Sequence, residues 1–415
     1  MSRPRISLTT VSPLQRRGIN RPFLEAAAWC KFPSICNALY IESVSTKSAD
    51  MQLASNQKSL GDLDRDRVNN FDFIRFVAAS LVIFSHSYLV TGTFSDEPLN
   101  HAVSFLNLGL DFGSMSVYVF FTISGYLITK SVFRQKSLGR FVLARALRIF
   151  PALAFCSMVC ALIAGPLVST LPFFSYFSFL DVYRFGLGNA TLLDMQPYLP
   201  GVFERNAYPK YVNSPIWTLP GEILMYAVVF SIGAGKLFIQ VPHNIGRVFP
   251  LVIVVCVYIF ALQLTATYLQ SALPWIAFFV LGMLAFKFRY RIVLKRRYLA
   301  LLWLAVIPYT LLQLPGFKAT VFAALAYSVF VFAYHPRMQI GNFSKHGDFS
   351  YGLYIYAFPV QQTLIAFQPE MSALTNFWIS YVLVFPLAVL SWHFIENPSL
   401  KLKDVRFRVF VKACG

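Results

Sequence analysis

Two basic side chains lie in the apolar segment FDFIRFVAASLVIFSHSYLV, residues 71–90. Arg75 and His86 have ten residues between them, so a helix would place them on nearly the same face, about 16 Å apart along its axis. Ionisable groups inside a membrane helix are costly and usually functional, and imidazole suits proton transfer near neutral pH. We therefore predict that His86 is a catalytic base and that Arg75, steered by Asp72, acts with it. The simpler roles are packing for His86 and a snorkelling anchor for Arg75.

A carboxylate lies in a second apolar segment, NSPIWTLPGEILMY, which begins at residue 213. Glu222 follows Trp217 and precedes Tyr226 by one helical turn. A carboxylate at this depth needs a charged partner or a wet cavity. We predict a catalytic or substrate-binding role for Glu222, with Trp217 and Tyr226 beside the substrate. A purely structural pairing of Glu222 with an arginine of another span is the alternative.

An arginine-rich segment, GRFVLARALRIFPAL, follows the apolar segment VFFTISGYLITKS. Arg145 and Arg148 would either mark the inner membrane face or bind phosphates, because a guanidinium offers paired donors to phosphate oxygens. The small residues Ser124 and Gly125 would let another helix, or a slender ligand, approach closely. The residues predicted to line a binding site for a phosphate-bearing ligand are Arg75, Ser124, Arg145 and Arg148.

The composition is that of an integral membrane protein, because 57% of the 415 residues are hydrophobic and 13% are charged. The formal net charge of +18 comes from short Lys and Arg clusters between apolar runs, which favours topology signals over nucleic-acid binding. The six cysteines have no metal-ligand spacing and indicate neither a zinc site nor a disulfide framework.

We predict an all-α, polytopic fold with about ten transmembrane helices. Basic residues gather in alternate loops, such as KFRYRIVLKRR, which predicts that both termini are cytoplasmic. The predicted parts are a largely disordered cytoplasmic extension over 1–70, a transmembrane domain over 71–396, a basic cytoplasmic tail over 397–415, and an external connection over 170–213. Translation could also start at Met51. The predicted spans are 71–92, 108–131, 149–169, 215–237, 248–268, 271–288, 298–314, 317–335, 349–369 and 375–396.

Several motifs in one order carry a resemblance to a known family. The Arg-x10-His pair, FFxxSG, RALRIFPAL, WTLxxE, SYxxYxxxxP and FIENP resemble the acyltransferase-3 family of bacterial membrane O-acyltransferases, over about residues 71–400. By this resemblance, Arg75 and His86 match the essential pair of the first span, Arg148 the inner-face arginine, and Glu222 the motif glutamate.

The resemblance implies an O-acetyltransferase of the bacterial inner membrane. Such an enzyme moves an acyl group, most often acetyl, from cytoplasmic acyl-CoA to a hydroxyl of a surface or secreted glycan or a lipid-linked saccharide. The donor acyl-CoA is a substrate, and no permanently bound cofactor, metal or nucleic acid is implied. In this interpretation His86 is the base, acting directly or through a transient acyl-enzyme, Arg75 and Arg148 hold the donor, and Glu222 orients the acceptor or the imidazole.

The chain departs from the family pattern at Ala357, where many members have histidine, and at Pro220 and Gly221, which could reshape the acceptor pocket. Because Ala357 replaces this histidine, a catalytically inactive member of the family is a further alternative. A proton-coupled secondary transporter, with Arg75, His86 and Glu222 in its pathway, is the alternative from another functional class. Near the end of the last span, His393 and Glu396 are three residues apart and are predicted to pair with each other.

Overall fold

The computed structural model describes residues 58–66, 69–104, 110–134, 137–238, 266–312, 317–335, 340, 343–345 and 347–403. These residues form helices and no β-strand beyond isolated bridges, which confirms the predicted all-α class for this part of the chain. Most of the predicted extension, the predicted span 248–268 apart from its last three residues, and the end of the basic tail lie outside the described residues.

Five helical segments of the described chain are long and apolar enough to cross a membrane. Two shorter apolar helices, Ser271–Lys287 and Lys318–Ala333, lie in α13 and α15. The principal helices are α3 (Leu60–Leu63), α4 (Phe71–Val90), α5 (Pro98–Val103), α6 (Phe112–Arg134), α7 (Leu138–Val159), α11 (Leu219–Phe238), α13 (Ala266–Lys287), α14 (Arg296–Leu311), α15 (Phe317–Ala333), α16 (Ser350–Phe367) and α17 (Ala373–Ser391). The spanning segments are Phe71–Val90, Phe112–Arg134, Gly139–Val168, Ser214–Ala234 and Ala373–Lys403.

The third spanning segment begins earlier than the sequence analysis placed it. A predicted start at residue 149 left the arginines in a loop, whereas α7 begins at Leu138. The Ser137 side chain accepts a hydrogen bond from the Arg140 amide and caps the helix, and Leu, Ala and Arg are good helix formers. Arg145 and Arg148, three residues apart, therefore lie on one helix face.

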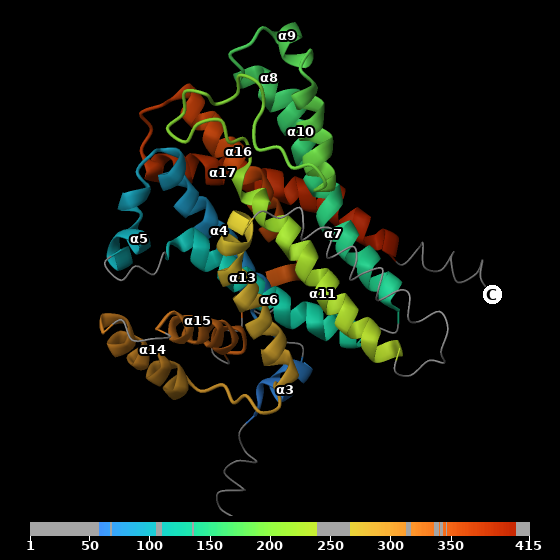
Figure 1. Ribbon diagram of the computed structural model, residues 1–415, viewed down its shortest axis with the longest axis vertical. Coiled ribbons are helices and arrows are strands. Elements are labelled where there is room, and N and C mark those ends of the chain that lie inside the picture. Colours follow the sequence, from blue (N-terminus) through green and yellow to red (C-terminus); the bar gives the residue numbers. More distant parts are fainter. Residues whose placement is uncertain are drawn as a thin grey trace, which may run out of the picture. The chain divides into compact units, whose positions relative to one another are not determined.

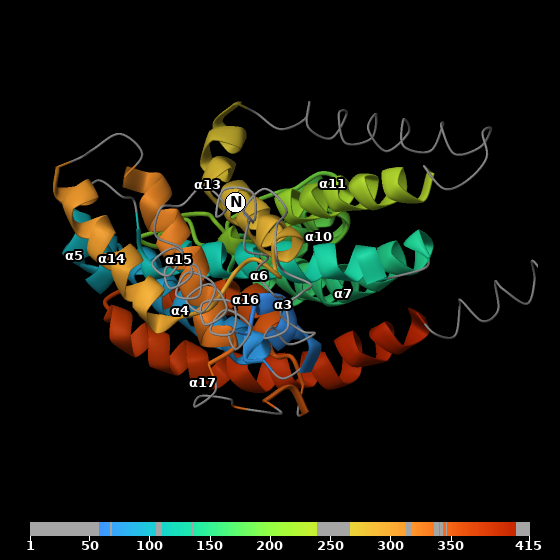
Figure 2. The ribbon, with the colours of Figure 1, turned by 90° about the horizontal axis from the view of Figure 1, so that it is seen from below.

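Two spanning segments contain a π-helical turn. The π-helix η5 (Cys160–Ala164) joins α7 to α8 (Gly165–Val168), and the π-helix η8 (Trp392–Glu396) continues α17. Figure 2 shows α17 as a long helix, and it packs on α16 and α4. The wider π-turn changes which side chains face the neighbouring helices, a feature often found at functional sites.

Short helices occupy the region predicted as an external connection. The helices α9 (Phe173–Phe177) and α10 (Leu180–Thr191) follow α8, and α10 packs against α7 (Figure 1). The buried Tyr176 hydroxyl donates to the Ala161 carbonyl at 2.8 Å, which ties α9 to η5. The 3-10 helix η6 (Ser214–Thr218) then leads directly into α11.

Helix α6 packs on both α4 and α13 (Figure 1). The backbones of α6 and α13 approach so closely that a Cβ on Gly125 would overlap the Phe279 carbonyl, and a Cβ on Gly282 would overlap the Thr122 carbonyl. The expected packing role of Gly125 is therefore confirmed. This contact fixes the position of α6, which carries Ser124 next to Gly125.

Gly125→Ala should lower the melting temperature of the detergent-solubilised protein, because a helix backbone cannot withdraw from an added methyl as a flexible side chain can. Overpacking of this kind costs about 1–3 kcal/mol. Thermal unfolding followed by intrinsic fluorescence measures it. Gly139→Ala in α7 is the matched control, since its methyl would meet only the Ser137 hydroxyl at 3.9 Å. Equal stability of the two variants would contradict the close packing.

Candidate functional site

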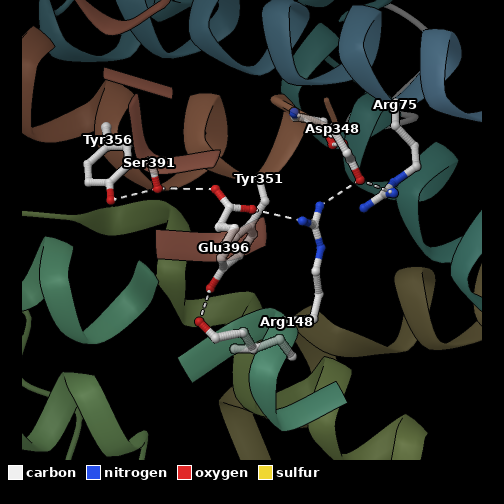
Figure 3. A network of polar contacts seen from close by, with 9 residues as sticks. Arg75, Arg148, Asp348, Tyr351, Tyr356, Ser391 and Glu396 are labelled. Carbon is white, nitrogen blue, oxygen red and sulfur yellow. Dashed lines mark hydrogen bonds and ion pairs between the residues drawn. The ribbon is translucent and has the colours of Figure 1, made fainter. Parts of the chain in front are cut away.

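A single carboxylate bridges two arginines from different helices (Figure 3). Asp348 Oδ2 accepts a hydrogen bond from Arg75 Nη1 of α4 at 2.8 Å and another from Arg148 Nη2 of α7 at 2.6 Å. The Ser350 hydroxyl donates to the other oxygen, Oδ1, at 2.5 Å. Asp348 precedes α16, so this bridge ties α4, α7 and α16 together. Asp348, rather than the expected Asp72, is the hydrogen-bonding partner of the Arg75 guanidinium.

The pKa of the Asp348 carboxyl lies below its usual range. Burial alone would raise this pKa, but the charges of Arg148 and Arg75 outweigh it, and the two hydrogen bonds from Ser350 add to their effect. The carboxylate is therefore ionised at neutral pH.

Arg148 also pairs with a second buried carboxylate. Its Nη1 donates to Glu396 Oε2 at 2.8 Å, and the Glu396 side chain is 1% exposed. The guanidinium carbon lies 5.5 Å from the ring centroids of both Tyr351 and Trp392. Ion pairs and two aromatic faces thus hold Arg148 in one orientation.

Glu396 does not pair with His393 as the spacing suggested. Its Oε1 accepts a hydrogen bond from Ser391 at 3.1 Å, and Ser391 accepts one from Tyr356 (Figure 3). The His393 ring instead lies against Phe349. Residues 392–396 form the π-helix η8, whose wider turn no longer stacks residues three apart.

The two arginines open onto a cavity of about 370 Å³, which we call the arginine cavity. Among the described residues that line it, basic side chains outnumber acidic ones. The basic ones are Arg75, Arg145, Arg148 and Lys403, and the acidic ones are Asp348 and Glu222. The buried Nε of Arg145 has no hydrogen-bond partner among the described residues. An unsatisfied guanidinium donor beside a cavity with excess positive charge suits an anionic ligand.

The predicted Glu222 also faces the arginine cavity, where it accepts a hydrogen bond from the Tyr226 hydroxyl, one turn along α11. Glu222 is therefore held by a neighbour on its own helix.

A second cavity, of about 260 Å³, contains the predicted base and is called here the histidine cavity. It is lined by His86, Trp217 and Asp111, among others. Asp111 accepts hydrogen bonds from the hydroxyls of Ser85, at 3.0 Å, and Ser114, at 2.5 Å. The cavity thus combines an imidazole, a carboxylate, hydroxyls and indoles.

His86 Nδ1 is buried without a hydrogen-bond partner in the described chain, and the ring packs edge-on against Phe358 at a centroid distance of 5.3 Å. The contact with Phe358 leaves this nitrogen without a hydrogen bond to the described residues. A polar nitrogen left unpaired at a cavity favours a role in chemistry.

Trp275 shapes the histidine cavity from α13. A Cβ on Gly221 would overlap its indole, so the glycine of the TLPGE segment gives Trp275 the space it occupies. Trp275 lines the histidine cavity and packs in a tilted arrangement, with 4.6 Å between ring centroids, against Phe121, a residue of the arginine cavity. The expected effect of Gly221 on a pocket thus has a structural basis.

The structure divides the predicted site residues between the two cavities. His86 and Trp217 line the histidine cavity. The arginine cavity is lined by Arg75, Ser124, Arg145, Arg148, Glu222 and Tyr226. His86 and Glu222 therefore face different cavities, although both were expected at one catalytic centre.

Sequence reasoning missed three side chains that complete these cavities, Asp348, Asp111 and Tyr354. Asp348 lies two residues before the SYxxY motif, and Asp111 lies near the start of the second predicted span. Acidic residues at the ends of motif-bearing spans were therefore the signal that could have identified them. No group of three or more His, Cys, Asp or Glu side chains in the described part of the chain could hold a metal ion.

The fold and the cavities define a multi-pass α-helical membrane protein with an internal polar site. A family model described as an acyltransferase domain matches residues 68–394. The chain is 29% identical, in an alignment of 349 residues, to a Shigella phage Sf6 protein described as O-acetyl transferase. This alignment covers 79% of the chain and 95% of that relative. It is 28% identical over 363 residues to nodulation protein 10 of Rhizobium leguminosarum bv. viciae, covering 81% of this chain and 94% of that relative.

Because the family model covers most of its length, this chain belongs to the acyltransferase-3 family and is a membrane acyltransferase. The resemblance drawn from its motifs is confirmed. No solved structure shows a significant match to the chain.

Asp348→Asn should destabilise the folded protein, because an amide cannot neutralise two guanidiniums. Breaking a buried ion pair costs at most about 3–5 kcal/mol. Thermal unfolding at pH 7 measures the loss. The control is Asp181→Asn, where the carboxylate is 60% exposed and 3.9 Å from Arg184, and where the loss should be below about 1 kcal/mol.

A comparison of the wild type with Asp348→Asn also tests the lowered pKa of Asp348. The carboxylate stabilises the fold above its unfolded-chain pKa of about 3.9, and this contribution is lost only as the pH falls through the lower folded value. The stability advantage of the wild type over Asp348→Asn should therefore not shrink between pH 7 and pH 5. A difference that already shrinks at pH 5 would show that the carboxylate is not held by the arginines.

Proposed function

We propose that this protein is an O-acetyltransferase that moves an acetyl group from acetyl-CoA to a hydroxyl of a cell-surface or secreted glycan. The strongest support is the arginine cavity, with its excess positive charge and the unpaired Arg145 Nε, next to the histidine cavity. The names of the two relatives, an O-acetyl transferase and a nodulation protein, support acetyl transfer and a saccharide acceptor.

The arginine cavity suits the donor because coenzyme A carries phosphates, which guanidiniums bind through paired hydrogen bonds. Arg145 offers the unpaired donor group, and Arg75 and Arg148 are already oriented by Asp348. Preoriented groups lose less conformational entropy when a ligand binds. In this proposal the arginine cavity binds the donor, with Ser124 on its wall.

The histidine cavity suits the acceptor because it combines Trp217 and Trp275 with the hydroxyls and carboxylate around Asp111. Apolar faces and a few placed polar groups are what a sugar requires of its binding site. His86 removes the proton from the acceptor hydroxyl, whose oxygen attacks the thioester carbonyl. The carbon–sulfur bond breaks, an ester carbon–oxygen bond forms, and the proton passes from His86 to the leaving thiolate. A transient acetyl group on His86 would give the same products in two steps.

The membrane orientation follows from the position of the basic loops. We propose that the Arg75 end of α4 faces the cytoplasm of a bacterial cell, in an inner-membrane protein of about ten spans with both termini inside. We also propose the division of the chain predicted from its sequence, into an extension over 1–70, a transmembrane domain over 71–396 and a tail over 397–415. The donor then enters from the side on which acyl-CoA is made, and the acceptor meets His86 deeper in the membrane.

Transfer of radiolabelled acetyl from acetyl-CoA to purified surface polysaccharide, by the full-length protein in detergent or proteoliposomes, tests the proposal directly. We expect label in the polysaccharide and release of free thiol in equal amounts. Proton-coupled uptake of a solute into vesicles without any acetyl transfer would instead identify a transporter.

His86→Ala should reduce acetyl transfer by about 10²–10⁴-fold, the range for a lost general base. Folding and membrane insertion should be unaffected, because Nδ1 forms no hydrogen bond within the described chain. The rate is measured per mole of folded protein. His101→Ala, at an exposed position of α5, is the control and should keep wild-type turnover. Near-wild-type turnover of His86→Ala would show that His86 is not the general base.

Arg145→Gln should raise the KM for acetyl-CoA by about tenfold or more, since a hydrogen bond to a charged group contributes about 1.5–3 kcal/mol. The KM for the glycan should change little. Arg140→Gln is the matched control, because Arg140 lies on the same helix but is exposed and outside both cavities. Equal effects of the two changes on the KM for acetyl-CoA would leave only a topological role for these arginines.

A further inference from the structure

Among the described residues, three line both cavities: Val117 of α6, Thr218 of η6 and Tyr354 of α16. They mark the place where the arginine cavity and the histidine cavity adjoin. We propose that Tyr354 is the partition between the two cavities and limits the length of the acyl group that can pass to His86. This inference rests on the proposed function, because it assumes a donor in one cavity and the base in the other.

The Tyr354 side chain is held at both ends. Its Cα belongs to α16, and its hydroxyl reaches η6, where it donates to the Pro215 carbonyl at 2.6 Å. The Thr218 hydroxyl lies 2.7 Å from the hydroxyl oxygen of Tyr354. The Phe120 ring, a part of the arginine cavity, packs at a steep angle to the tyrosine ring with 6.2 Å between centroids. The ring cannot swing aside without breaking these contacts.

The position of His86 explains why a partition between the cavities would affect acyl transfer. Arg75 and His86 lie about 16 Å apart along α4 and line different cavities. The acyl carbon must therefore come to the junction for an acceptor beside His86 to attack it. A two-carbon acetyl group needs little space at the junction, whereas each further methylene must fit against a ring that is fixed in place.

Tyr354 is the strongest candidate among the three shared residues because it is the largest and is pinned by hydrogen bonds. Val117 can only contribute bulk. Thr218 is small and acts through its hydrogen bond to the tyrosine. Truncating Tyr354 should widen the junction, and removing only its hydroxyl should loosen it.

The test compares acetyl-CoA with butyryl-CoA as donors for the full-length protein, with polysaccharide as acceptor, and reports the ratio of the two kcat/KM values. In Tyr354→Ala this ratio should move towards butyryl by about tenfold or more, since one methylene in a tight pocket changes discrimination by about 10–200-fold. Tyr354→Phe keeps the ring but loses both hydrogen bonds, so it should show a smaller shift in the same direction.

Tyr356→Phe is the matched control. It also removes a tyrosine hydroxyl from α16, one bonded to Ser391 at 3.1 Å, but Tyr356 lines neither the arginine cavity nor the histidine cavity. Its donor ratio should equal that of the wild type. A shift as large as that of Tyr354→Phe would mean that general loosening of α16 sets the ratio.

An unchanged ratio in both Tyr354 variants, with acetyl transfer still measurable, would overturn the inference. If Tyr354→Ala does not fold or is inactive with both donors, the ratio in Tyr354→Phe alone decides. Absence of acetyl transfer by the wild-type protein would refute the proposed function instead, and so the two failures are distinguishable.

Discussion

The site depends on one carboxylate that neutralises two guanidiniums inside a membrane protein. Asp348 accepts hydrogen bonds from Arg75 and Arg148 on the same oxygen, and these side chains come from helices that are far apart in sequence. Two arginines this close would repel each other without a shared anion. The same contacts that hold α4, α7 and α16 in place also hold the cations of the arginine cavity. Stability and the proposed donor binding therefore share one set of interactions, which constrains any change at Asp348.

The second constraint is the length of α4. A single helix carries Arg75 near its beginning and His86 near its end, and the two residues open into different cavities. In the proposed mechanism, this separation lets a charged donor stay among the arginines while the proposed base, His86, lies in the other cavity. A reaction between the two cavities would then depend on the proposed junction at Tyr354, and the proposed base would not need to contact the arginines.

Sequence patterns predicted the helical class and singled out six residues that line the arginine cavity, although two of them, Glu222 and Tyr226, were expected beside the acceptor. They did not predict Asp348, because it pairs with residues 200 and more positions away and lies before a helix rather than in one. They also placed Trp217 and Glu222 together. Trp217 belongs to the 3-10 helix η6 and Glu222 to α11, and the two side chains line different cavities. Such juxtapositions arise from tertiary packing, which a periodic pattern does not contain.

The alanine at position 357 is easier to interpret with both cavities in view. Ala357 is 3% exposed and belongs to an apolar cluster that also contains Leu353 and Val384. It lines neither the arginine cavity nor the histidine cavity. A histidine there would need a polar partner within that cluster, since burying an unpaired polar group is costly. The proposed chemistry requires only His86 as base, so the loss of the late histidine removes no group from the described cavities.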